Sequence, residues 1–203
     1  DGYTLLMAYH SHVINPALYP KLPFDTVKAF APITQVAVQP QLLNVHPSLP
    51  AKNVKELIAL AKARPGQLLY GSAGSGSGGH LANEIFNTMA GVRMTHVPYK
   101  GSAPALIDVI AGHTQLMFAT LITSLPHVRS GRVRAMGVSS LKRSAVLPDV
   151  PAIAETLPGY DISNWYGLAG PKGLQKAIVA RLNAEILRAL ATPDLRRTFE
   201  KEA

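Results

Sequence analysis

Apolar runs alternate with amphipathic segments along this chain of 203 residues. Residues 3–9 form a nearly continuous apolar run, which is typical of a buried strand. Residues 33–38 and 41–45 predict two separate strands, because Gln39-Pro40 lies between them. Further strands are predicted at residues 67–70, 93–97, 115–118, 134–139 and 162–168.

The helical pattern is clearest at residues 54–63, where Asn53 supplies an N-cap and Pro65-Gly66 a stop. Other helices are predicted at residues 81–90, 103–111, 121–129, 152–156 and 174–191, with a last helical piece from Pro193. Residues 13–32 contain four prolines and are therefore expected to be loop with at most short turns. Strands that alternate with helices predict an α/β fold with mainly parallel sheets.

The chain is expected to pass twice between two lobes, at Gln39-Pro40 and within residues 159–164. On this interpretation residues 1–39 and 163–203 form lobe 1, and residues 40–162 form lobe 2.

Composition narrows the class of protein. Hydrophobic residues make up 47% and charged residues 16%, which suits a globular core, and no apolar run reaches the length of a membrane span. The absence of cysteine excludes disulfides and thiolate metal sites. A formal charge of +8 fits an ordinary soluble basic protein and is also compatible with anionic partners. Nucleic acid is not expected among them, because the basic residues are scattered and only 6% of residues are aromatic.

One stretch, residues 71–80, contains five glycines and three serines between a predicted strand and a predicted helix. Its bare backbone N–H groups at a helix start predict an anion site. Gly74, Gly76 and Gly79 formally match the dinucleotide fingerprint, although the next strand ends at residues 95–98 without the acid that binds ribose. A nucleotide-dependent oxidoreductase that uses the Gly74–Gly79 loop stays the alternative function.

Other catalytic chemistry has little support. A nucleophile elbow needs a glycine two residues before its serine, and Ser72, Ser75 and Ser77 lack it. A pairing of Ser72 or Ser77 with His80 is only conceivable. His10 and His12 would share a strand face, but the spacing suggests no third metal ligand. The residues by themselves therefore give little support to catalysis and suggest no metal site, and they favour binding.

A second loop, residues 99–104, opens the next predicted helix. In an open α/β sheet both loops would lie at the carboxyl ends of strands, where ligands bind. Two helix N-termini that point into one crevice would hold a carboxylate through N–H groups and the helix dipole.

Seven motifs, in this order, closely resemble the tripartite tricarboxylate transporter substrate-binding family, also called Bug-type solute receptors. They are Asp1-Gly-Tyr-Thr-Leu-Leu6, Tyr70-Gly-Ser-Ala-Gly-Ser-Gly-Ser-Gly-Gly-His-Leu81, His96-Val-Pro-Tyr-Lys-Gly-Ser-Ala-Pro-Ala-Leu106, Leu116-Met-Phe118, Leu147-Pro-Asp-Val-Pro151, Trp165-Tyr-Gly-Leu168 and Arg181-Leu-Asn-Ala-Glu-Ile186.

The resemblance implies a monomeric periplasmic receptor with the two-lobed, type II-like periplasmic binding protein fold and two crossing strands as its hinge. Such a receptor closes on a small organic carboxylate and delivers it to the permease subunits of a membrane transporter. It needs no cofactor and catalyses no reaction. Family members usually begin with a further strand–helix–strand unit and continue a little beyond the position of Ala203, so this chain is expected to be a fragment with an incomplete lobe 1.

The resemblance also implies which residues bind the ligand. This chain differs from the family pattern at Ala119 and Thr120, where the family often has Asp-Asn, so a ligand role at these two positions is lost or altered. The positions carried over are Ser72, Ala73, Gly74, Ser75, Gly76, Ser77 and His80 in the first loop, Tyr99, Lys100, Gly101, Ser102 and Ala103 in the second, and His10, Ser11, His12 and Tyr166 from lobe 1.

Overall fold

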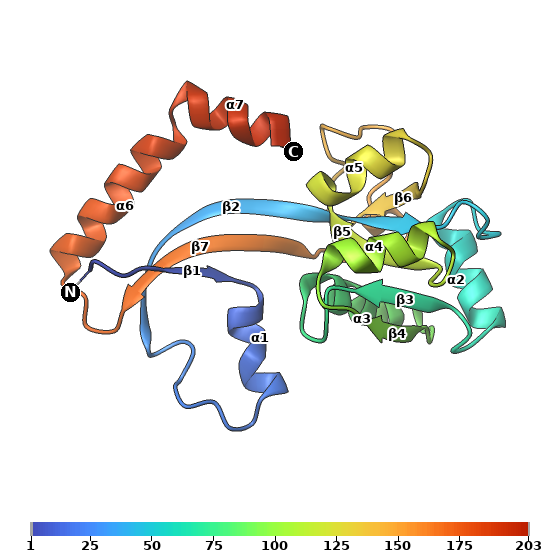
Figure 1. Ribbon diagram of the computed structural model, residues 1–203, viewed down its shortest axis with the longest axis horizontal. Coiled ribbons are helices and arrows are strands. Elements are labelled where there is room, and N and C mark those ends of the chain that lie inside the picture. Colours follow the sequence, from blue (N-terminus) through green and yellow to red (C-terminus); the bar gives the residue numbers. More distant parts are fainter. Residues whose placement is uncertain (1, 203) are drawn as a thin grey trace. The chain divides into compact units, whose positions relative to one another are not determined.

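The computed structural model describes residues 2–202, with side chains as far as Phe199. It divides into two compact units (Figure 1). Unit 1 combines residues 1–38 with residues 164–203, and unit 2 is the continuous segment of residues 39–163. The chain therefore passes from one unit to the other at two places.

Unit 2 is built on a mixed sheet in the order β6-β2-β5-β3-β4. β3 (Leu69–Ser72) runs parallel to β4 (Thr95–Pro98) and β5 (Leu116–Thr120). The end of β2 (Phe30–Val45) runs antiparallel to β5 and to β6 (Arg134–Val138). The α/β class is confirmed, but the expectation of a mainly parallel sheet was wrong, because β2 lies between two later strands that both run against it.

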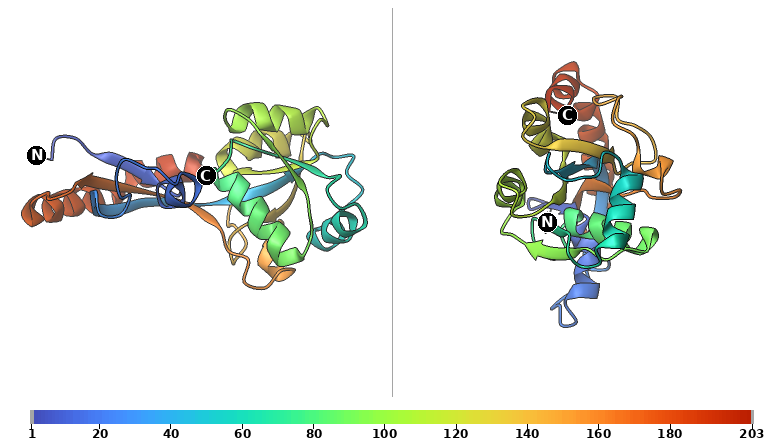
Figure 2. Two further views of the ribbon diagram at one scale, coloured as in Figure 1. Left: turned by 90° about the horizontal axis from the view of Figure 1, so that it is seen from below. Right: turned by 90° about the vertical axis from the view of Figure 1, so that its right-hand side faces the viewer.

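Helices cover both faces of this sheet, as Figure 2 shows. On one face α2 (Val54–Ala63) and α3 (Gly78–Ala90) contribute Leu57 and Phe86 to a core that also contains Phe118 and Tyr160. On the other face α4 (Ser102–Ile110) and α5 (Leu121–Arg129) pack Leu106 and Leu125 against smaller apolar clusters. The apolar stripes of the helices thus meet a sheet that is buried on both sides.

Unit 1 contains β1 (Leu6–Tyr9), α1 (Ser11–Leu18), the first part of β2, most of β7 (Ser163–Pro171), α6 (Lys176–Leu190) and α7 (Pro193–Glu202). β1 pairs with β7 in an antiparallel register. The Asn183 side chain of α6 donates a 2.8 Å hydrogen bond to the Ile33 carbonyl. Neither α1 nor α6 contains a buried residue, so both helices lie on this unit without entering a core.

Two predictions for the first forty residues were wrong. His10, Ser11 and His12 do not end a strand, because His10 is the N-cap of α1 and the other two lie in its first turn. Residues 13–18 are also not loop, because they belong to α1. The four prolines of residues 13–32 led to the prediction of a loop, although only Pro16 lies in the helix and it costs a single hydrogen bond.

β2 is one continuous strand of 16 residues, whereas the sequence predicted a break at Gln39-Pro40. The ladder with β5 begins at Gln41, one residue after the proline. Pro40 thus stands just outside this ladder, so its missing N–H costs no hydrogen bond to β5.

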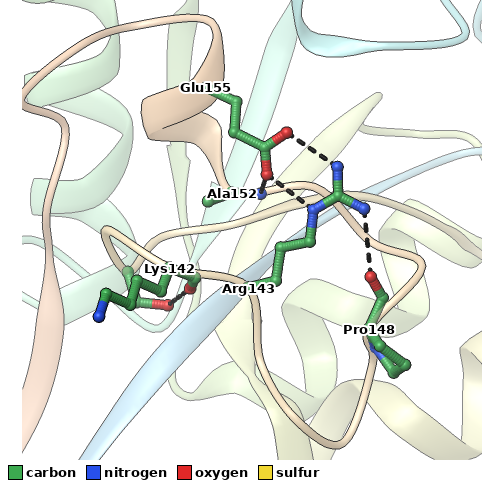
Figure 3. Close-up of polar contacts among 6 residues, drawn as sticks. Lys142, Arg143, Pro148, Ala152 and Glu155 are labelled. Carbon is green, nitrogen blue, oxygen red and sulfur yellow. Dashed lines mark hydrogen bonds and ion pairs between the residues drawn. The ribbon is translucent and has the colours of Figure 1, made fainter.

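Between β6 and β7 the chain forms a long loop with one short 3₁₀-helix, η1 (Ile153–Glu155). Arg143 binds both carboxylate oxygens of Glu155 at 2.8 Å and donates to the Pro148 carbonyl at 3.2 Å (Figure 3). Glu155 also accepts the N–H of Ala152 at 2.9 Å. Because Arg143 stabilises the carboxylate, the pKa of Glu155 falls to about 2. These contacts tie the loop to η1.

Candidate ligand-binding site

Three helices of unit 2 begin at the carboxyl ends of neighbouring parallel strands. α3 follows β3, α4 follows β4 and α5 follows β5 (Figure 1). The N–H of Tyr99 donates a 3.0 Å hydrogen bond to the carbonyl of Ser72, the last residue of β3, which continues the β3–β4 ladder to the start of the loop after β4. A Cβ atom at Gly74 would lie 3.2 Å from the Tyr99 carbonyl. The two glycine- and serine-rich loops of the sequence are therefore in contact.

The glycine loop, residues 72–80, depends on two glycines in the left-handed region. Gly74 has φ of +125° and Gly76 has φ of +77°, which other residues rarely adopt. Ser77 then caps α3, since its Oγ accepts the N–H of His80 at 3.3 Å. A Cβ atom on Gly79 would meet the Phe118 carbonyl at 2.5 Å, so only glycine lets α3 approach β5 this closely.

Three aromatic rings, those of Tyr70, His96 and His80, are stacked on one another at this loop. The His96 ring stacks on Tyr70 with a centroid distance of 4.9 Å and on His80 with a distance of 4.1 Å. Nε2 of His96 lies 2.7 Å from the Ser72 Oγ, and Nδ1 of His80 accepts the N–H of Gly76 at 3.2 Å. His96 thus holds the glycine loop at Ser72, and His80 holds it at Gly76.

The surroundings favour the uncharged forms of two of these rings, those of His96 and Tyr70. Burial, with a further contribution from neighbouring His80, lowers the pKa of His96 to about 4. Burial and a hydrogen bond to Glu84 raise the pKa of Tyr70. Around neutral pH a neutral His96 can accept a hydrogen bond from Ser72, whose side chain is fully buried and unsuited to attack a substrate.

The second loop is fixed by a tyrosine–carboxylate contact. The Tyr99 hydroxyl donates to Asp108 of α4 at 2.5 Å. Burial and this hydrogen bond raise the pKa of Tyr99 to about 12, and the same hydrogen bond lowers the pKa of Asp108. Gly101 is the N-cap of α4, with φ of +123° and no side chain to occupy the helix end.

The predicted residues fall into two groups. Unit 2 brings together those of the glycine loop and of the second loop, where Lys100 is exposed and Ser102 and Ala103 lie in the first turn of α4. The others are in unit 1. Tyr166 of β7 is the register partner of Tyr9, which directly precedes His10, and Nε2 of His12 contacts the Thr26 carbonyl at 2.6 Å.

The sequence did not predict the role of three polar residues. His96 and Asp108 anchor the two loops through side chains that come from other elements. Thr120 caps α5, because its Oγ accepts the N–H of Thr123 at 3.4 Å. A threonine before an amphipathic segment is a helix-start signal, so only this last role was readable in advance. Neighbouring Ala119 is buried.

The pairing of Ser72 or Ser77 with the His80 side chain is not present in the described residues, because Ser72 contacts His96 and Ser77 binds the backbone of His80. Within residues 2–202 no cluster of three or more His, Asp or Glu side chains could hold a metal ion. None of the described helices is long and apolar enough to cross a bilayer. What the two loops offer is backbone N–H groups and helix dipoles for an anion.

Comparison with known proteins agrees with this geometry. A family model described as "Tripartite tricarboxylate transporter family receptor" matches residues 1–203. A curated relative from Pseudomonas sp. strain P51, a UPF0065 protein encoded between tcbD and tcbE, is 38% identical over 197 residues, which are 96% of this chain and 59% of the relative. The chain spans about three fifths of the length of the curated relatives it matches.

Two solved structures are similar over nearly the whole chain. R. palustris Rpa4515 with adipate has a TM-score of 0.86 and 35% identity, covering 100% of this chain and 75% of its own. MatC from Rhodopseudomonas palustris with bound malate has a TM-score of 0.85 and 33% identity, covering 97% of this chain and 67% of the MatC chain. This likeness confirms the periplasmic binding protein fold. Because the matching family consists of receptors, the oxidoreductase alternative has no support.

Proposed function

Since this chain belongs to the tripartite tricarboxylate transporter receptor family, we propose that it is the part of a periplasmic solute receptor that holds a small organic carboxylate against the loops of unit 2. The observation that carries the proposal is the contact between the loops that lead into α3 and α4, where a Cβ atom on Gly74 would lie 3.2 Å from the Tyr99 carbonyl. Neutral N–H groups at such a contact bind a carboxylate and release it again, because they form no ion pair.

Further support comes from the bound molecules in similar proteins. The two structures named above contain adipate and malate, which are both dicarboxylates. The proposed ligand class for this chain is therefore a small dicarboxylate or a related organic acid. The binding positions of the sequence analysis remain part of the proposal, with the two loops of unit 2 as its centre.

We also propose that units 1 and 2 belong to the two lobes of the receptor, which close on the solute by bending where the chain passes between them. The receptor would act as a monomer in the periplasm and deliver the solute to the permease subunits of its transporter.

Isothermal titration with malate, adipate, citrate and benzoate tests the binding proposal. It is performed on the natural full-length protein, because this chain covers only about three fifths of its curated relatives. We expect one site with a Kd in the micromolar range for at least one of the dicarboxylates, about −8 kcal/mol. A lack of heat with all four acids contradicts the proposal.

Two matched glycine variants locate the site. Gly74 and Gly159 both have positive φ, so alanine strains the backbone at either position. Only Gly74 lies in the glycine loop, whereas a Cβ on Gly159 would have no atom within 4 Å. We expect Gly74→Ala to weaken binding at least tenfold and Gly159→Ala to leave it within twofold of the wild type. Equal losses in both variants would place the site elsewhere.

A further inference from the structure

Ser139, directly after β6, bonds to both segments that lead from unit 2 to unit 1. Its backbone N–H donates to the Gln41 carbonyl at 2.8 Å, and its Oγ accepts the Gln41 N–H at 2.7 Å. Its backbone carbonyl accepts the N–H of Ile162 at 2.8 Å, and its hydroxyl donates to the Ile162 carbonyl. The side chain of Ser139 is completely buried.

This arrangement departs from an ordinary antiparallel ladder. Leu42 pairs with Val138 in the β2–β6 register, so Gln41 and Ser139 form the next pair. Residues of a hydrogen-bonded pair normally exchange two backbone bonds. Here the Gln41 N–H binds the Ser139 hydroxyl instead of the Ser139 carbonyl. That carbonyl is thereby left for Ile162.

The residues that Ser139 contacts lie close to the two boundaries of unit 2. Gln41 lies two residues inside unit 2 from its first boundary at Gln39, and Ile162 lies one residue inside its second boundary at Ser163. Both covalent connections between the units thus start from segments that are bonded to the same residue. The hydroxyl of Ser139 is shared by the two segments, since it accepts from one and donates to the other.

We propose that Ser139 is a positioning residue that clamps the two crossing segments to each other on the unit 2 side of the hinge. The clamp fixes their spacing, so that bending takes place beyond it, at the boundaries themselves. Its effect on ligand affinity rests on the proposed function, because affinity depends on closure only if the units close on a ligand.

Hydrogen exchange of the ligand-free natural protein, resolved to single amides, tests the clamp. In Ser139→Ala the Gln41 N–H loses its hydroxyl acceptor and competes for the carbonyl of residue 139. We therefore expect the amide of Ile162 to exchange about tenfold faster, although its own acceptor has not been removed. Ser139→Cys serves as a second variant if Ser139→Ala does not fold, because it keeps nearly the same volume and has only a weak hydrogen-bonding group. We expect the amide of Ile162 to exchange faster in this variant too.

Ser140→Ala is the matched control. This neighbouring serine also binds a backbone carbonyl, that of Lys142 at 2.8 Å, but within its own loop. We expect exchange at Ile162 to stay within twofold of the wild type in the control. Exchange at Ile162 that is equally unchanged in Ser139→Ala and Ser139→Cys would overturn the clamp.

Calorimetry with malate and adipate gives the second readout. We expect Ser139→Ala to bind about three- to tenfold more weakly than Ser140→Ala, although neither serine lies in the two ligand loops. Equal affinities would overturn the link between the clamp and binding. If the wild type binds none of the four acids of the titration described above, the proposed function is contradicted, whereas the exchange result still decides the clamp.

Discussion

The two units differ in how much apolar surface they bury inside themselves. All three hydrophobic clusters of the described residues lie within unit 2, between Leu42 and Tyr160. Unit 1 has few buried apolar residues, among them Ala8 and Ile33, while residues such as Met7 and Val27 are exposed. Burial of apolar area is the main source of folding free energy, so the difference predicts that unit 2 folds by its own contacts and unit 1 does not.

Separating the units should produce the largest effect. We expect residues 39–163 alone to unfold cooperatively, with a Tm within about 5 °C of that of the 203-residue chain. Residues 1–38 joined by a Gly/Ser linker to residues 164–203 should show no cooperative transition in circular dichroism. A cooperative transition of that joined segment would contradict the comparison.

One phenylalanine from each unit allows the difference in packing to be measured as a free energy of unfolding. Phe118 is 2% exposed in the core of unit 2, and Phe24 is 47% exposed in unit 1. In the 203-residue chain we expect Phe118→Ala to lower the free energy of unfolding by about 3–5 kcal/mol, because a cavity forms. Phe24→Ala should cost about 1 kcal/mol or less, through its edge contact with Phe30. Urea denaturation measures both, and equal losses would refute the difference.

Two glycines compare how well each unit tolerates added volume. A Cβ on Gly79 would meet the Phe118 carbonyl at 2.5 Å, and a Cβ on Gly170 would meet the Leu174 Cδ2 atom at the same distance. Backbone in a packed sheet cannot move aside, whereas the end of a leucine side chain can. We expect Gly79→Ala to destabilise the chain by about 1–3 kcal/mol and Gly170→Ala by about 0.5 kcal/mol or less, as measured by urea denaturation. A reversed order would mean that unit 1 is packed more rigidly than unit 2.

The smallest effect concerns pH. Burial lowers the pKa of His96 to about 4, whereas a histidine in the unfolded chain titrates near its ordinary pKa of 6.5. Between these values the unfolded chain binds the proton and unit 2 does not, so stability falls as the pH decreases from about 6.5 to about 4. Allowing for partial exposure, we expect a loss of about 1–2 kcal/mol. Urea midpoints across this range should vary less in His96→Gln, and an equal slope would contradict this origin.

The sequence predicted the elements of unit 2 well, and α2 was predicted with the bounds observed. Its strong helix signals, Asn53 at the start and Pro65-Gly66 after the end, are local in the chain. The helix α1 and the continuity of β2 were missed, because proline was interpreted as a break where its missing N–H costs little.

For the candidate site, the two loops were recognisable because glycine and serine at a helix start are a local pattern. The residues that anchor them were not. His96 reaches Ser72 across 24 positions, so this contact exists only once the sheet has formed. The same holds for the hinge contact of Ser139 with Gln41, which spans 98 positions.

The hydrogen bonds of Ser139 to both crossing segments also make unit 2 a segment that is suited to transfer into another protein. Its first and last segments, at Gln41 and Ile162, are bonded to one residue, so the two ends of unit 2 lie next to each other. A segment with adjacent ends can be inserted into the loop of another protein or have its ends joined and new termini opened at an exposed turn such as Gly131.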